Sequence, residues 1–159
     1  MKLRAVVPAA VIAVLVTGGL TATPAQAAEP FAMSAHLTVT RTGPDHERFE
    51  VEGKVTMSQA AAYDAISHGY KVAVRYWGDD PSSDDLLHGP KNAQIWVAYD
   101  GLHFKHTWLA HVKDADEDDY PYGELDDTDE FYAGTRFLDP KGATFRKAES
   151  NRVTDYLKT

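Results

Sequence analysis

The chain of 159 residues contains no cysteine. Disulfide bonds, thiol catalysis and cysteine-ligated zinc are therefore excluded. Basic residues are also scarce, with 16 lysines and arginines against 24 aspartates and glutamates, and the formal net charge is −8. Because phosphate binding requires clustered basic side chains, we expect no nucleic-acid partner.

Long apolar runs are equally scarce, and the clearest one lies near the amino terminus. Two basic residues precede an apolar stretch over 5–20, and residues 25–27 (Ala-Gln-Ala) have the small-x-small pattern of a cleavage site. These features predict a secretory signal peptide at 1–27 and a single domain at 28–159. A membrane anchor is the alternative, but the run is shorter than the ~20 residues of a spanning helix. We expect a secreted, extracellular protein without stable membrane insertion.

Alternation of apolar and polar residues is the main pattern in the rest of the chain. Alternation of this kind is typical of half-buried strands, and it is predicted here at 36–41, 49–57, 70–77, 93–99, 102–112 and 131–138, with one bent or two short strands in 143–157. Ser58 can cap a helix and Gly69 can end it, so a short helix is predicted over Ser58–His68. The predicted fold is all-β: an antiparallel β-sandwich of about seven strands with this one helix inserted.

Two connections carry further expectations. The two prolines of 78–91 predict a loop without regular structure. Asp100-Gly101 predicts a tight hairpin, and a two-residue turn at this position would place Val97 opposite Phe104.

A strongly acidic segment, 114–130, is the most distinctive stretch, because ten of its 17 residues are aspartate or glutamate. If successive strands are antiparallel, it lies at the same end of the sandwich as the acidic loop 78–92. The D-x-D-x-D spacing lets alternate carboxylates converge on one ion, so the segment predicts a metal site. The first choice of ligands is Asp114, Asp116, Asp118 and Asp119, and the second is Asp79, Asp80, Asp84 and Asp85.

Calcium is the expected cofactor, because it takes about six to eight oxygen ligands in flexible geometry. The match to an EF-hand fails: Asp119 occupies the position of the invariant glycine, and Leu125 that of the bidentate glutamate. The general plan instead resembles that of C2-type domains, in which acidic loops at one end of a sandwich bind calcium. Two alternatives stay open, namely that the acidic residues are only solvated or that they contact a basic protein.

Aromatic and histidine side chains supply the remaining candidates. Trp77 and Trp96 fall on outward positions of their strands, where tryptophan can stack on a sugar or bury in a partner. The alternative for both is packing under a loop or against the helix. His103, His106 and His111 do not predict a zinc site, because alternation turns His106 to the opposite face.

No catalytic arrangement can be identified from the sequence. Ser82, Ser83 and His88 lie near aspartates, but a Ser-His-Asp triad is a spatial arrangement that spacing alone does not establish. We therefore expect a secreted, non-catalytic domain that binds calcium through its acidic loops and contacts an extracellular protein or carbohydrate. The alternative is a metal-independent acidic interaction or inhibitor protein that targets a basic partner.

Overall fold

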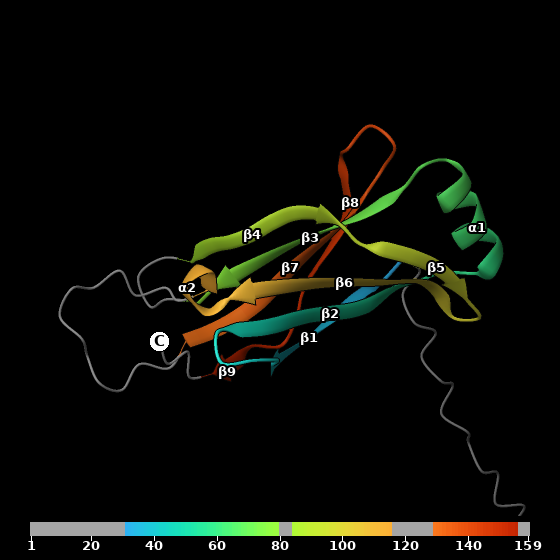
Figure 1. Ribbon diagram of the computed structural model, residues 1–159. Helices are drawn as coiled ribbons and strands as arrows, with labels where there is room; N and C mark the ends of the chain where they lie inside the picture. Colours follow the sequence, from blue (N-terminus) through green and yellow to red (C-terminus); the bar gives the residue numbers. More distant parts are fainter. Residues whose placement is uncertain (1–30, 80–83, 116–128, 156–159) are drawn as a thin grey trace, which may run out of the picture.

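The computed structural model describes residues 31–79, 84–115 and 129–155. Within these ranges nine strands and two helices follow one another along the chain (Figure 1). They are β1 (Met33–Arg41), β2 (His46–Thr56), α1 (Gln59–Ser67), β3 (Lys71–Gly78), β4 (Asp85–Asn92), β5 (Gln94–Ala98), β6 (Gly101–His111), α2 (Val112–Ala115), β7 (Asp129–Leu138), β8 (Thr144–Glu149) and β9 (Val153–Asp155).

The strands form two antiparallel sheets that pack face to face. The first sheet has the order β1-β2-β6-β5, and the second has the order β4-β3-β7-β8. β8 and β9 follow each other along the same edge of β7. This arrangement confirms the predicted all-β sandwich, and the two short strands at the end of the described chain were one of the two expected possibilities.

Aromatic side chains fill the space between the sheets, because alternation turns one face of every strand inward. Phe49 of the first sheet is completely buried. Its ring centroid lies 5.1 Å from that of Phe131 and 6.0 Å from that of Tyr76, both in the second sheet. Trp108 stacks on the same ring at 4.8 Å. The Phe49 side chain thus contacts residues of both sheets. Because the chain has no disulfide bonds, close packing of this kind is what holds the sheets together.

The inserted helix is confirmed together with its predicted ends. The Ser58 hydroxyl accepts a hydrogen bond from the Ala61 backbone N–H at 3.2 Å, and Gly69 takes the left-handed conformation, with φ 82°, just after the helix. Ala62 and Ala65 are its buried residues. Figure 1 shows α1 beside the β5–β6 turn, at the end of the sandwich opposite α2.

The predicted hairpin register is wrong by two positions. Val97 pairs with Leu102, and the turn consists of Tyr99 and Asp100 rather than Asp100 and Gly101. Gly101 is already part of β6, where a β-carbon would overlap the carbonyl oxygen of Val55. Glycine is therefore needed here because it lets β2 pass close to the backbone of β6. Because the shift is an even number of residues, every side chain keeps its predicted face.

The prediction that 78–91 lacks regular structure is also wrong, because β4 occupies Asp85–Asn92. β4 pairs with β3 through a ladder interrupted by register shifts, and its Gly89–Pro90 peptide bond is cis. Within the described residues β4 is an edge strand. Proline is tolerated there because the outer edge needs no N–H donor.

An asparagine ties the other edge of the sandwich together. Asn151, between β8 and β9, accepts a hydrogen bond from the Leu37 backbone N–H at 2.9 Å and donates one to the Leu37 carbonyl oxygen at 3.1 Å. The side-chain amide thus pairs with β1 as a neighbouring strand would. Nearby, Ser150 exchanges hydrogen bonds with Ala133 of β7. These contacts close the first sheet onto the second at this edge.

Replacing Gly53 with alanine should destabilise the fold. A β-carbon at this position would overlap the Ser34 carbonyl oxygen and the Phe104 ring, which is completely buried. We expect the free energy of unfolding to fall by about 1–3 kcal/mol in urea denaturation, as in other overpacked cores. Gly43→Ala is the matched control, because a β-carbon there would meet no atom beyond its chain neighbours within 4 Å, and the φ of Gly43 is not positive. Equal stability of the two variants would contradict this packing account.

Candidate functional site

The described parts of the two acidic segments lie at the same end of the sandwich. β3 ends and β4 begins there, and β6 leads there into α2 (Figure 1). The Asp79 backbone N–H donates a hydrogen bond to the Glu130 carbonyl oxygen at 2.7 Å, which joins the segment after β3 to the start of β7. Antiparallel topology thus produces the juxtaposition expected from the sequence. We call this part of the molecule the acidic end.

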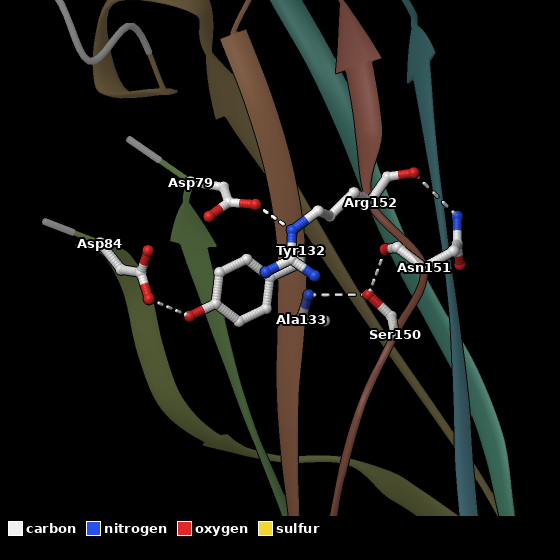
Figure 2. Close-up of polar contacts among 7 residues, drawn as sticks. All are labelled: Asp79, Asp84, Tyr132, Ala133, Ser150, Asn151 and Arg152. Atoms are coloured by element: carbon white, nitrogen blue, oxygen red, sulfur yellow. Dashed lines mark hydrogen bonds and ion pairs between the residues drawn. The ribbon is translucent and has the colours of Figure 1, made fainter. Parts of the chain in front are cut away.

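Asp79 has a basic partner. Its carboxylate accepts a hydrogen bond from the Arg152 guanidinium, just before β9 (Figure 2). The same guanidinium lies over the Tyr132 ring, 5.1 Å from the ring centroid. The Asp79 carboxylate raises the pKa of Arg152 through this hydrogen bond and through its charge. Asp79 thus connects the end of β3 to the edge strand β9.

Asp84 is bound by a residue of β7, Tyr132. The Tyr132 hydroxyl donates a hydrogen bond to its carboxylate at 2.8 Å (Figure 2). The pKa of Tyr132 is raised, first by burial and then by this hydrogen bond, so the hydroxyl keeps its proton. Both described ends of the 80–83 segment are therefore attached to β7 and β9, and both carboxylates already have protein partners.

The other predicted ligands differ in position. Asp85 is exposed at the start of β4, and Asp114 is exposed within α2. α2 itself is anchored, because Val112 and Ala115 are buried. Asp80, Asp116, Asp118 and Asp119 lie outside the described residues. The prediction that 114–130 is loop is wrong at its two described ends, since α2 includes Asp114 and β7 begins at Asp129.

Neither a metal cluster nor a membrane-spanning helix is present in the described ranges. There, no group of three or more histidine, aspartate or glutamate side chains is arranged to hold a metal ion. In the same part of the chain, no helix is long and apolar enough to cross a membrane.

The two candidate tryptophans are on different sheets and do not form one surface. Trp77 of β3 is half-buried: it stacks on Tyr132 at 6.4 Å between centroids, and it covers Gly134 so closely that a β-carbon there would lie 3.1 Å from the indole nitrogen. In the described part of the chain, Trp77 therefore packs against the neighbouring strand β7. Trp96 of β5 is 40% exposed. Of the two, Trp96 alone is presented to solvent as a stacking surface would be.

The three histidines of β6 have separate partners. His103 lies on the outer face beside Asp100, and His111 lies 5.3 Å from the ring of His46. His106 turns inward, with its Nδ1 3.0 Å from the Tyr76 hydroxyl. The predicted opposite orientation of His106 is confirmed.

A cluster that the sequence did not indicate surrounds His106. The Tyr76 hydroxyl donates to the His106 carbonyl oxygen at 3.2 Å, so it accepts from the protonated Nδ1 of the same residue. His88 of β4 lies 6.3 Å from His106 and stacks almost parallel on Trp108, with centroids 4.7 Å apart. The cluster joins β4 to β6. Sequence reasoning misses it because 78–91 is predicted to be a loop.

A second arrangement that sequence reasoning misses lies on the outer face of the first sheet. Asp100 accepts hydrogen bonds from the Lys54 ammonium at 2.6 Å and from His103 Nε2 at 2.7 Å. The pKa of Asp100 falls to about 2, chiefly because of the bond from Lys54 and then that from His103. The sequence assigns Asp100 only to a turn, and the signal that could have revealed its role is the alignment of Lys54 with His103 across β2 and β6.

Comparison with known proteins yields no relative: no family model matches the chain, and neither a curated protein nor a solved structure matches it significantly. Any function must therefore be argued from the site itself.

The His88–His106 cluster should make stability depend on pH. Burial lowers the pKa of both rings below the ordinary 6.5, assisted by the charge of Lys91 and, for His106, by His88. As the pH falls below 6.5, the unfolded chain takes up protons first, so stability is lost on acidification. We expect the free energy of unfolding to be lower at about pH 5.5 than at pH 7.5.

His88→Phe keeps an aromatic ring on Trp108 and should reduce this difference, whereas the exposed His36→Gln should leave it unchanged. Urea denaturation at both pH values measures the effect. Equal pH dependence in the wild type and His88→Phe would show that His88 is not its source.

Proposed function

We propose that this protein is a secreted, non-catalytic β-sandwich domain that binds calcium at its acidic end and contacts an extracellular protein or carbohydrate. The observation that supports calcium most directly is the meeting of the two acidic segments, where the Asp79 N–H bonds to the Glu130 carbonyl oxygen. Neighbouring carboxylates repel one another by about 1 kcal/mol per close pair in water, and by more when partly shielded. A divalent cation offsets that repulsion.

Two of the carboxylates predicted as ligands already have protein partners, which narrows the proposed set. Asp79 and Asp84 are engaged by Arg152 and Tyr132, so their role in the proposal is to hold the loop ends in place. Asp114, Asp116, Asp118 and Asp119 are the proposed first ligands, with Asp80 and Asp85 as the second choice. Calcium would act structurally, because binding to the folded state alone adds to its stability.

The test is the melting temperature of the protein in EDTA, in 5 mM magnesium and in 5 mM calcium at constant ionic strength. With a Kd of about 0.1 mM, calcium should stabilise the fold by about 2 kcal/mol, which corresponds to several degrees. Asp116→Asn with Asp118→Asn should lose most of this rise.

Asp64→Asn with Glu149→Gln removes the same charge at exposed positions on α1 and β8 and should retain the full rise. The absence of a calcium-specific rise in the wild type would refute the metal site. The acidic end would then be assigned to solvation or to a basic partner, whose binding should weaken strongly with salt.

A further inference from the structure

The outer face of the first sheet carries an ordered row of side chains around Trp96. Lys54 of β2 pairs with His103 of β6, and His103 pairs with Trp96 of β5. Ile95 and Val97, on either side of the tryptophan, pack against the core, so the indole stands on the outer face. Its ring centroid is 5.7 Å from that of His103.

Asp100 fixes the polar members of this row. Each of its two oxygens accepts one hydrogen bond, from Lys54 and from His103. The three side chains are therefore held by one another beside the exposed indole. Groups that are already positioned lose little conformational freedom when a ligand binds.

The next row of the same face adds further hydrogen-bonding groups. Gln94 pairs with Lys105, which in turn pairs with Glu52. The Lys105 ammonium lies 2.8 Å from a carboxylate oxygen of Glu52 and 2.8 Å from one of Glu50. Gln94 is exposed and offers both a donor and an acceptor. We define the Trp96 patch as Lys54, Gln94, Trp96, Asp100, His103 and Lys105.

The charges of the Trp96 patch indicate the class of ligand. Both lysines are neutralised by carboxylates of the same face, and His103 shares the carboxylate of Asp100. Both ammonium groups are therefore paired rather than left to attract an anionic partner, and the two rows hold three carboxylates, those of Asp100, Glu50 and Glu52, against these two ammonium groups. An anionic ligand is thus disfavoured, whereas a neutral ligand fits these paired charges if it is rich in hydrogen-bonding groups and has an apolar face that can stack on an indole.

We propose that the Trp96 patch binds a neutral carbohydrate, with a sugar ring stacked on Trp96 and its hydroxyls bonded to Gln94, His103 and the paired charges. A pyranose presents C–H groups on one face and hydroxyls around its rim, which matches an amphipathic aromatic ring set among fixed polar groups. This inference rests on the proposed function in taking the domain to be a binding protein, but it does not depend on calcium.

Native gel electrophoresis in soluble polysaccharides tests the site. The gels contain xylan, glucomannan, mixed-linkage β-glucan or dextran as neutral probes and polygalacturonate as the anionic probe, each with EDTA and with calcium. We expect at least one neutral probe to retard the wild type in both conditions. Trp96→Ala should weaken that binding about tenfold or more, since the stacking contact is lost.

Leu109→Ala is the matched control, because Leu109 is a 60% exposed apolar residue of the same sheet, on β6. It should bind as the wild type does. Melting curves establish that both variants remain folded. Retardation by no neutral probe, retardation by polygalacturonate alone, or undiminished binding by Trp96→Ala would each overturn the proposal.

A reducing-end assay on the retained polysaccharide separates this inference from the proposed function. New reducing ends would refute the non-catalytic function while leaving the Trp96 patch as the site of contact. A failure of calcium to raise the melting temperature would likewise leave the binding measured in EDTA unaffected.

Discussion

The packing of Phe49 between the two sheets is the contact on which the rest of the structure depends. Without cysteine the sheets cannot be joined covalently, so their alignment relies on side chains that touch both. Phe49 meets Phe131 and Tyr76 across the sandwich and Trp108 within its own sheet. Tyr76 and Trp108 then contact the histidines of β4 and β6. The aromatic core therefore extends to β4 at the edge of the second sheet, and contacts with the core hold this irregular strand in place.

Polar contacts join the two sheets at their edges, as the aromatic core joins them at the centre. Asn151 connects β1 to the chain between β8 and β9, and Arg152, the next residue, holds Asp79 after β3. Consecutive residues thus secure both the closure of the sandwich and one flank of the acidic end. The fold accommodates the acidic residues at that end because the described residues beside them, Asp79 and Asp84, are bound to β7 and to the start of β9.

Local signals were sufficient for part of the fold, and tertiary pairing decided the remainder. The ends of α1 follow from Ser58 and Gly69 because capping is a property of neighbouring residues. The β4 strand could not be predicted, since proline disfavours it locally and only pairing with β3 produces it. The predicted hairpin register was wrong because Gly101 is required by its contact with Val55 rather than by the turn. The polar row of the Trp96 patch was missed for the same reason: Asp100 acquires its role only when β2 and β6 are aligned.

The two proposed sites lie towards opposite ends of the sandwich, and the strand that links them limits how they can influence each other. β6 carries His103 near one end and leads into α2, with Asp114, at the other. Between them it is paired along its length with β2, and its inward residues pack in the aromatic core. A strand held in this way does not move independently, and coupling between sites requires an element with two arrangements. Calcium would therefore stabilise the domain as a whole without changing the geometry around Trp96, so the sugar affinity of the folded protein should not depend on the metal.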